Sequence, residues 1–465
     1  MKKYENKKIA ILGLGMEGQA LANFLISEVQ SIDIIEQKEQ SQILADLEVS
    51  DRAELENILN NPKVNFKHSE ELPSLLEYEL IFRSPSIYFA HPKILEAKKA
   101  GVTVSSQIQL FFDLCPCRII GVTGTKGKGT TASLIFSMLN LHVKGNVYLA
   151  GNIGTPAITM VPNLKNDDIV ILELSNFQLA DLTKSPEIAV VTNLEVDHLD
   201  YHKDKAEYQL TKTNIVQFQN EDGIAILNKE SSFDTDFIDK IKSKVLYFST
   251  TNQTDAFVED DRVFLNKNNE MKKVCSAGEI KLVGTHNLAN IAAASLVAAE
   301  LQIELPIISR AVKEFQGLPH RLEFVRELNN IKFINDSFAT NPGPTIAAVK
   351  AFKETKILIL GGSEKGADFS EMAEVISESN TKAVVTIGVE SGRIISALKR
   401  SNFSGQILEG GNSIDEIIYQ AFSIASPGDI IVFSPACASF DMFKNYKERG
   451  EQFKNSVFKL ESKSK

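Results

Sequence analysis

Residues 119–133, IIGVTGTKGKGTTAS, place a loop rich in glycine and lysine between an apolar strand and a helical pattern. Glycines let the backbone come close to an anion, and the following helix presents unpaired N–H groups and the positive end of its dipole. A lysine there adds a point charge beside the β- and γ-phosphates of a nucleotide. We therefore predict a phosphate-binding loop formed by Gly124, Thr125, Lys126, Gly127, Lys128, Gly129, Thr130 and Thr131.

This loop departs from the standard pattern GxxxxGK[ST] in two places. Val122 stands where the first glycine belongs, and Gly129 follows Lys128 directly, so the hydroxyl for Mg²⁺ has to come from Thr130 or Thr131. The alternative is a glycine-rich surface loop with a solvated lysine. The order of strand, loop and helix favours the phosphate-binding loop.

The composition is that of a globular protein with more than one domain. A chain of 465 residues is too long for one core, so we expect about two to four domains. Acidic residues outnumber basic ones, 60 to 50, which argues against a nucleic-acid or membrane surface and favours small-molecule partners. Glycines and Glu17 interrupt the apolar run near the start, so we expect neither a signal peptide nor a membrane span.

The chain has four cysteines, of which only Cys115 and Cys117 are close in sequence. A CPC segment without a second pair is a poor zinc site. The other two, Cys275 and Cys437, are far from it and from each other. We therefore expect reduced thiols, as in a cytoplasmic protein.

A second glycine-rich turn lies near the start of the chain. An apolar strand at residues 8–12 precedes Gly13, Gly15 and Gly18, which form the pattern GxGxxG, and a helix follows. The next strand ends at Glu36, 18 residues after the last glycine, as in the dinucleotide-binding fingerprint. This pattern is weak on its own. It predicts a Rossmann-like nucleotide-binding domain without selecting the nucleotide.

Beyond the phosphate-binding loop, we expect a buried strand at residues 169–179, IVILELSNFQL, which carries Glu173. A carboxylate that emerges from an apolar strand beside such a loop can hold the magnesium of a nucleotide. A buried glutamate satisfied by hydrogen bonds is the alternative. The next strand, residues 188–192, leads to His198 and His202, whose spacing suggests zinc but does not follow HExxH. We expect His198 to bind magnesium or water and His202 to be exposed.

Three further features follow along the chain. Lys212 lies on a helix at residues 205–218, where a solvated lysine is the usual outcome. Asn290, near the start of an alanine-rich helix, can contact a base edge or cap the helix. Residues 317–325, GLPHRLEFV, form a candidate hinge. After this segment, strands and helices alternate as in a doubly wound sheet, and polar residues gather at the carboxyl ends of strands, where ligands bind.

Longer motifs occur in a fixed order along the chain. They are GVTGTKGKGTT, GNIGTPA, ELSNFQL, TNLEVDHLDYH, GTHNLANIAAA, GLPHRLE, NDSFATNP, GGSEKGADF and SPACASFDMFKNYKERGEQF. Together they resemble the Mur ligase family, and the likeness covers essentially the whole chain. Within the family, the motifs are most similar to those of the ligases that add D-glutamate to UDP-N-acetylmuramoyl-L-alanine.

This resemblance implies an α/β protein of three domains. They would be a Rossmann-like domain for the UDP-linked substrate at residues 1–117, a central P-loop ATPase-like domain at 118–316, and a C-terminal Rossmann-like domain for the amino acid at 317–465. It also implies a cytoplasmic enzyme of peptidoglycan synthesis, and we expect a monomer. In the implied reaction, the substrate carboxylate takes the γ-phosphoryl group of ATP, and the amine of D-glutamate displaces phosphate.

The resemblance also assigns site residues. The catalytic set, with two Mg²⁺ ions, would be Lys128, Glu173, His198 and Lys212 together with Thr130, and Lys212 would be carbamylated. Beyond the phosphate loop, ATP would contact Asn290, Arg321 and Asp336. The UDP-linked substrate would contact Gly13, Leu14, Gly15, Met16, Glu36, Gln37, Ser84 and Asn152. The amino acid would contact Thr340, Lys365, Ser439 and Tyr446.

Some positions depart from the family pattern. Gly129 after Lys128 resembles the GKGS of folylpolyglutamate synthases, which moves the expected magnesium hydroxyl to Thr130. Phe338 replaces the usual lysine of DSKATN, which removes a cation near the glutamate pocket. Tyr446 replaces the usual phenylalanine, a milder change.

Two alternatives to this function stay open. One is a related Mur or folylpolyglutamate-type ligase that adds another amino acid, although the N-terminal Rossmann unit disfavours a folate ligase. The other is a catalytically inactive nucleotide-binding regulator, which Gly129 and Phe338 would suggest. The regulator is disfavoured because five expected site residues remain: Lys128, Glu173, His198, Lys212 and Lys365.

Overall fold

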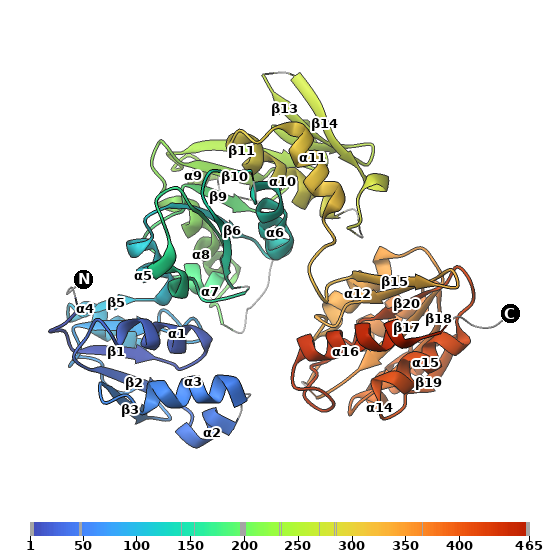
Figure 1. Ribbon diagram of the computed structural model, residues 1–465, viewed down its shortest axis with the longest axis horizontal. Coiled ribbons are helices and arrows are strands. Elements are labelled where there is room, and N and C mark those ends of the chain that lie inside the picture. The colour runs from blue at the N-terminus through green and yellow to red at the C-terminus, as the bar shows by residue number, and fades with distance from the viewer. Residues whose placement is uncertain are drawn as a thin grey trace. The chain divides into compact units, whose positions relative to one another are not determined.

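The computed structural model describes residues 4–45, 49–140, 142–152, 154–195, 201–231, 233, 235–268, 270–282, 284, 286–364 and 366–461. Two expected site residues, His198 and Lys365, lie outside these ranges. Three separate sheets organise the described chain, and they follow one another in the colour order of Figure 1. Most strands are parallel and alternate with helices, so the α/β class expected from the sequence is confirmed.

The first sheet has the strand order β3-β2-β1-β4-β5, and all its neighbours are parallel. Its elements are β1 (Ile9–Leu12), α1 (Met16–Leu25), β2 (Ile32–Glu36), α2 (Gln40–Ala45), α3 (Val49–Leu59), β3 (Val64–His68), β4 (Leu80–Arg83), α4 (Pro92–Lys99), β5 (Thr103–Ser105) and α5 (Gln107–Leu114). The chain runs outward from β1 to β3 and then returns to β4 on the other side. Doubly wound sheets bind ligands at such a reversal, beyond the carboxyl ends of the strands.

The second sheet has nine strands in the order β14-β13-β12-β11-β10-β9-β6-β8-β7. Its strands are β6 (Arg118–Thr123), β7 (Val147–Gly151), β8 (Ile169–Glu173), β9 (Ile188–Val191), β10 (Ile224–Asn228), β11 (Lys244–Ser249), β12 (Ala256–Glu259), β13 (Arg262–Lys267) and β14 (Glu270–Ser276). Its helices are α6 (Lys128–Leu139), η1 (Ala157–Asn163), α7 (Asn176–Leu179), α8 (Lys205–Gln217), α9 (Thr235–Ile238), η2 (Ala277–Glu279), α10 (His286–Glu300) and α11 (Leu305–Glu314). β6 lies between β8 and β9 and is parallel to both, so the loop after β6 opens between the segments that follow these two strands.

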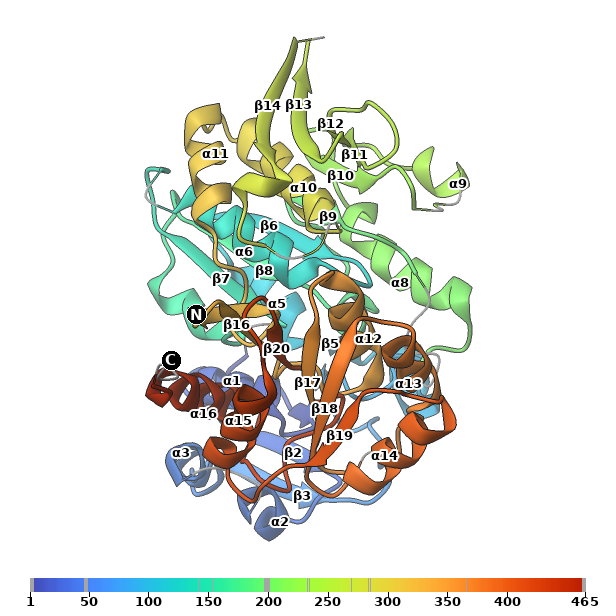
Figure 2. The same ribbon diagram turned by 90° about the vertical axis from the view of Figure 1, so that its right-hand side faces the viewer.

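The third sheet has the order β15-β16-β20-β17-β18-β19, with only β15 antiparallel to its neighbour. Its elements are β15 (Glu323–Leu328), β16 (Ile331–Asn335), α12 (Pro342–Ala351), β17 (Lys356–Gly361), α13 (Ser370–Ser377), β18 (Thr381–Ile387), α14 (Ser391–Arg400), β19 (Gln406–Glu409), α15 (Ile414–Ile424), β20 (Ile430–Phe433) and α16 (Tyr446–Lys459). Helices α12, α13 and α14 cover one face of this sheet and α15 and α16 the other (Figure 2). Their apolar side chains pack in two clusters, one on each face. The last strand in the sequence, β20, lies inside the sheet between β16 and β17.

Contacts divide the chain into two compact units. Unit 1 comprises Met1–Ala277 and Leu288–Val312, and it holds the first two sheets. Unit 2 comprises Gly278–Asn287 and Lys313–Lys465, and it holds the third. The domain boundaries at residues 117 and 316 stay predictions. Searched over the described ranges, the chain has no helix that is both long and apolar enough to span a membrane.

Two elements differ from the sequence expectation. The strand expected at residues 169–179 ends at Glu173, and α7 follows, because Ser175 and Gln178 form a capping box that starts a helix. The sequence also predicts a final helix at residues 441–460. It begins only at Tyr446, where the Asn445 side chain accepts hydrogen bonds from the N–H groups of Lys447 and Glu448. In both places a local cap sets where the helix begins.

Candidate active site

The loop between β6 and α6 depends on two glycines with positive φ. Gly124 has a φ of +144°, and a Cβ there would lie 2.0 Å from Thr192 Oγ1. Gly127, the N-cap of α6, has a φ of +84°, and a Cβ there would lie 2.3 Å from Asn290 Oδ1. No L side chain fits either position without a shift of its neighbours. The loop is therefore tight, as the sequence predicts, and its binding of an anion stays a prediction.

Asn193 holds the outer part of this loop. Its Oδ1 accepts hydrogen bonds from the backbone N–H groups of Thr125, at 2.9 Å, and Lys126, at 2.8 Å. Asn193 was not among the expected site residues. It follows a strand expected at residues 188–192, and polar residues at the carboxyl ends of parallel strands often lie at binding sites. The loop is therefore shaped by a side chain from the neighbouring β9 segment as well as by its glycines.

Two lysines converge on one carbonyl of the loop. Lys128 Nζ donates to Gly124 O at 3.0 Å and to Thr125 O at 3.1 Å. Lys212 Nζ, from α8, donates to the same Gly124 O at 3.0 Å. Lys212 is only 1% exposed, so the solvated helix lysine suggested by its local sequence is wrong. Two cations and a helix N-terminus at one loop make a site suited to a polyanion.

Glu173 ends β8 beside this loop and is buried. Asn152, which follows β7, donates from its side chain to Glu173 Oε1 at 2.9 Å and from its backbone N–H to Glu173 O at 2.8 Å. The two residues are therefore held as a pair at the carboxyl ends of β7 and β8. Thr130 and Thr131, in the first turn of α6, are both buried, and the Thr131 hydroxyl donates to Asn290 Oδ1 at 3.4 Å.

His202 is buried, so the expectation of an exposed side chain is wrong. Its ring stacks on Phe177 and meets Tyr208 edge to face. Asn176 Nδ2 lies 2.6 Å from His202 Nε2, and Glu207 Oε2 lies 3.7 Å from His202 Nδ1. The ring is thus part of the packing between α7 and α8, which a spacing of acids and histidines cannot reveal.

The expected contacts to the UDP-linked substrate, Asn152 excepted, gather at the reversal of the first sheet. Gly13, with a φ of +89°, follows β1, and a Cβ there would lie 2.8 Å from Ser84 Cβ, which follows β4. Glu36, at the end of β2, accepts a hydrogen bond from the Leu14 N–H at 2.6 Å. Gly15 is the N-cap of α1. Glu36 Oε1 also accepts from the N–H of Gln37 at 2.7 Å, and Met16 is exposed.

Of the expected residues of unit 2 that the structure describes, Asp336 follows β16 directly and Ser439 follows β20. Asp336 is buried, and its carboxylate accepts from Ser434 Oγ at 2.7 Å and from the Leu322 N–H at 3.1 Å. Burial raises the pKa of Asp336 to about 7, although these hydrogen bonds and Arg321 oppose the shift. The Arg321 guanidinium lies 4.6 Å from the centre of the Phe338 ring.

Phe338 also meets the ring of Tyr446 edge to face, at 5.1 Å between centroids. Burial raises the pKa of Tyr446, and the nearby Arg321 opposes the shift. An arginine therefore lies against the aromatic side chain that stands where the resemblance expects a lysine. Ser439 is buried close to the end of β20, and Thr340, half-buried, lies just before α12.

Comparison with known proteins settles the family. Residues 7–106 match the model of the MurD-like N-terminal domain, residues 122–298 the Mur ligase middle domain, and residues 320–437 the Mur glutamate ligase domain. The chain belongs to the Mur ligase family. The resemblance seen in the sequence is confirmed.

Relatives of this Mur ligase cover its whole length. The UDP-N-acetylmuramoylalanine–D-glutamate ligase of Acetivibrio thermocellus is 36% identical over 99% of this chain and 98% of its own. The enzyme of the same name from Clostridium tetani is 36% identical over 98% and 97%. The crystal structure of the UDP-N-acetylmuramate–alanine ligase MurC of Thermotoga maritima shares the fold, with a TM-score of 0.57 and 18% identity over 97% of this chain and 99% of that one.

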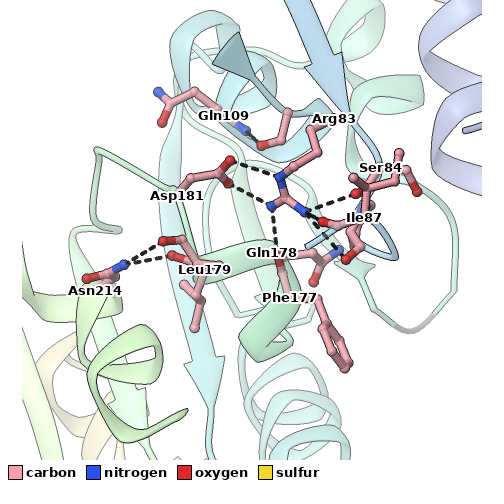
Figure 3. Close-up of polar contacts among 12 residues, drawn as sticks. Arg83, Ser84, Ile87, Gln109, Phe177, Gln178, Leu179, Asp181 and Asn214 are labelled. Carbon is pink, nitrogen blue, oxygen red and sulfur yellow. Dashed lines mark hydrogen bonds and ion pairs between the residues drawn. The ribbon is translucent and has the colours of Figure 1, made fainter. Parts of the chain in front are cut away.

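Two buried arginines of this Mur ligase, one in each compact unit, hold loops that carry expected site residues, and neither had an expected role. Arg83 ends β4, and its guanidinium binds Asp181 and several backbone carbonyls, as Figure 3 shows. Arg449, on α16, donates from Nε to Ser337 Oγ at 2.9 Å and from Nη1 to the carbonyls of Cys437 and Ala438 at 3.0 and 3.1 Å. Arg449 therefore joins the loops that follow β16 and β20. Its partner Ser337 lies 112 residues away, so no local pattern marks this pairing.

The structure describes only some of the residues expected to hold magnesium. Within the described ranges, no group of three or more histidine, cysteine, aspartate or glutamate side chains could hold a metal ion. The expected set includes His198, which lies outside these ranges, and Lys212, which offers oxygen ligands only once carbamylated. Glu173 and Thr130 supply the oxygen ligands that Mg²⁺ prefers. These donors fit Mg²⁺ in chemistry.

Proposed function

We propose that this Mur ligase adds D-glutamate to UDP-N-acetylmuramoyl-L-alanine at the expense of ATP, as a cytoplasmic step in peptidoglycan synthesis. The names of its full-length relatives and the match of its first domain to the MurD-like model support this substrate pair. One geometric observation carries the ATP half of the proposal. Lys128 donates to Gly124 O and Thr125 O at the mouth of a glycine-rich loop that leads into the N-terminus of α6, where a nucleotide triphosphate would find a cation and unpaired N–H groups.

The reaction needs alignment and charge neutralisation more than a protein nucleophile. A carboxylate oxygen of the substrate attacks the γ-phosphorus of ATP, and the bond to the β-phosphate oxygen breaks, giving an acyl phosphate and ADP. The amine of D-glutamate then attacks the acyl carbon, phosphate leaves, and the amine gives up a proton. Lys128 and the N-terminal amides of α6 would offset the charge of the transferred group.

Magnesium would be held by Glu173, Thr130, His198 and carbamylated Lys212. When bound, it would neutralise phosphate charge and fix the geometry of the phosphoryl group. Carbamylation leaves one N–H on Lys212 Nζ, so the hydrogen bond to Gly124 O can persist while a new carboxylate is added. Burial of an unmodified ammonium group beside a metal would be unfavourable. These points support the carbamylated form and two Mg²⁺ ions.

The other ligands are assigned by position. The UDP-linked substrate would lie beyond β1 and β4, near Gly13 and Ser84, and reach Asn152. Asn290, Arg321 and Asp336 would lie on the adenine and ribose side of ATP. Thr340, Lys365, Ser439 and Tyr446 would bind D-glutamate. We also propose that the domains end at residues 117 and 316 and that the enzyme acts as a monomer.

Phosphate release is the test of this function. Purified enzyme with ATP, Mg²⁺ and UDP-N-acetylmuramoyl-L-alanine is offered a panel of D- and L-amino acids, and turnover with D-glutamate above all others is expected. Turnover only with another amino acid would show a related ligase, for which Phe338 and Arg321 would be the first residues to exchange. Tight nucleotide binding without turnover on any amino acid would indicate a regulator instead.

A further inference from the structure

Arg83 is a buried cation at the meeting of the first and second sheets. Its side chain is 0% exposed and that of Asp181 is 8% exposed. The pair is bidentate, with Arg83 Nε 3.0 Å from Asp181 Oδ2 and Nη2 2.9 Å from Oδ1 (Figure 3). Burial would lower the pKa of Arg83, but Asp181 reverses this and raises it overall. A charge removed from water in this way is stable only where its geometry is well satisfied.

The same guanidinium also binds the loop that follows β4. Nη1 donates to Ser84 O at 3.0 Å, to Pro85 O at 3.4 Å and to Ile87 O. Nη2 donates to Phe177 O, in α7, at 3.1 Å. Arginine has five N–H donors in a rigid plane, and here they serve two segments that lie more than 90 residues apart. Arg83 therefore fixes the position of one segment relative to the other.

The two segments belong to the two substrate sites. Ser84 follows β4, at the reversal where the UDP-linked substrate is expected. α7 begins three residues after Glu173, the buried carboxylate beside the phosphate loop. Additional contacts join the same parts: Tyr88 OH donates to Glu207 Oε1 at 2.7 Å, on the helix that carries Lys212, and Gln178 Nε2 donates to Glu17 of α1. A displacement of the loop would thus change the distance between the acceptor and the phosphoryl donor.

We propose that Arg83, through Asp181, is a positioning residue that aligns the loop at residues 84–87, and with it the UDP-linked substrate, with the phosphate-binding loop. This inference rests on the proposed function for the identity of the substrate. The pair does not touch the reacting atoms. It sets where the acceptor carboxylate sits, and a shift of about 1 Å in such alignment can cost on the order of 100-fold in rate.

Arg83→Met, Arg83→Lys and Asp181→Asn test the proposal by steady-state kinetics with each substrate varied in turn. For Arg83→Met we expect KM for the UDP-linked substrate to rise on the order of 10-fold and kcat to fall, while KM for ATP changes by less than about 2-fold. Arg83→Lys keeps the charge but not the planar fork, so it should recover only part of the loss. The double variant Arg83→Met with Asp181→Asn should have the same KM and kcat as Arg83→Met alone, because the two residues act as a unit.

Arg118→Met is the matched control. Arg118 Nε lies 2.9 Å from Glu187 Oε1, a distance like that of the Arg83 pair, but both side chains are more than 40% exposed. Such a surface pair contributes little, so its loss should leave both KM values unchanged. Equal rises in both KM values for Arg83→Met, or a lower melting temperature with unchanged kinetics, would overturn the proposal and leave a purely structural role.

Hydrogen exchange separates this inference from the proposed function. In Arg83→Met, the amides of Ser84, Ser86 and Ile87 should exchange faster, while those of residues 124–127 should keep the wild-type rate. If wild-type enzyme fails to turn over UDP-N-acetylmuramoyl-L-alanine with any amino acid, the proposed function fails, whereas faster exchange confined to residues 84–87 still supports the alignment. Unchanged exchange with normal kinetics in the variant overturns the inference alone.

Discussion

Lys212 shows how much burial changes the meaning of a residue. Its Nζ lies 3.0 Å from Gly124 O, a carbonyl to which Lys128 also donates. The same Nζ lies 4.8 Å from the centre of the Tyr208 ring. A lysine on a helix is usually solvated. A buried ammonium group beside a metal site is unfavourable, and carbamylation would replace its charge with a carboxylate. Its part in catalysis can therefore be tested through the carboxylate that carbamylation would add.

We expect Lys212→Ala to lower kcat at least on the order of 100-fold, because a metal-binding carboxylate would be lost. Short carboxylic acids such as acetate should restore part of the activity, since a free carboxylate can occupy the space of the carbamate. The measurement is phosphate release with rising acetate. Chloride at the same ionic strength is the control, and full activity of the variant without acetate would refute the role.

Asp336 gives a prediction about pH. In the unfolded chain its pKa is near 3.8, and in the fold burial raises it to about 7. The folded state therefore binds the proton more tightly, so the stabilisation by this group is complete below about pH 3.8 and is lost as the pH rises to about 7. At roughly 1.4 kcal/mol per pKa unit, the loss could approach about 4 kcal/mol.

Asp336→Asn keeps a neutral polar group at every pH, so it should remove this loss. We expect urea unfolding at pH 8 to show a variant more stable than the wild type by roughly 1 to 4 kcal/mol, with little difference at pH 4. Asp222→Asn, at an exposed turn, is the control and should change neither value. Parallel stability curves for wild type and Asp336→Asn would contradict the raised pKa.

At the scale of the element, the phosphate loop is the part most tightly defined by backbone conformation. Gly124→Ala would place a Cβ 2.0 Å from Thr192 Oγ1 at a φ of +144°. We expect ATP turnover to fall on the order of 100-fold or more, because the loop amides would lose their alignment with the phosphates. Nucleotide binding and circular dichroism would be measured together.

Gly101→Ala separates loop geometry from backbone strain. Gly101 also has a positive φ, +88°, but nothing lies within 4 Å of its Cβ position. This variant should lose about 1 kcal/mol of stability and keep full activity. If Gly124→Ala were as active as Gly101→Ala, close contact at the loop would have no part in binding.

Elements with local signals were predicted well from the sequence. The sequence pattern predicts a strand at residues 80–83 and a helix at 370–377, and β4 and α13 have these ends. The phosphate loop lies where its glycines place it. The strand at residues 169–179 was predicted too long, because α7 is as buried as β8 and an apolar run does not separate the two. The hairpin of β13 and β14 and the antiparallel β15 were not predicted, since their burial pattern is irregular.

The sequence predicts those residues of the candidate site that lie within continuous sequence motifs. Gly13 and Ser84, far apart in sequence, meet as the doubly wound topology requires. Arg83 and Arg449 could not be found in this way, because their partners Asp181 and Ser337 are 98 and 112 residues away. Such pairings depend on the tertiary fold, which one sequence does not specify residue by residue.

At the scale of the whole molecule, the proposed reaction needs both compact units. The phosphate loop belongs to unit 1, and Ser439 and Tyr446 belong to unit 2. The amine of the amino acid has to reach the acyl phosphate, so we expect the units to close on their ligands. The radius of gyration from small-angle X-ray scattering should fall when UDP-N-acetylmuramoyl-L-alanine and a non-hydrolysable ATP analogue are added together.

ADP alone should have a smaller effect in that experiment, since it lacks the group to be transferred. Scattering profiles that superpose with and without the full ligand set would count against closure.

The central position of β20 bears on how the enzyme is made. β20 lies between β16 and β17, and Arg449 of α16 joins the loops that carry the amino-acid residues, so the third sheet needs the last part of the chain to be synthesised. The phosphate loop and its lysines are complete more than 200 residues earlier. A nascent chain can thus form the phosphate-binding loop and both of its lysines on the ribosome well before the third sheet is complete.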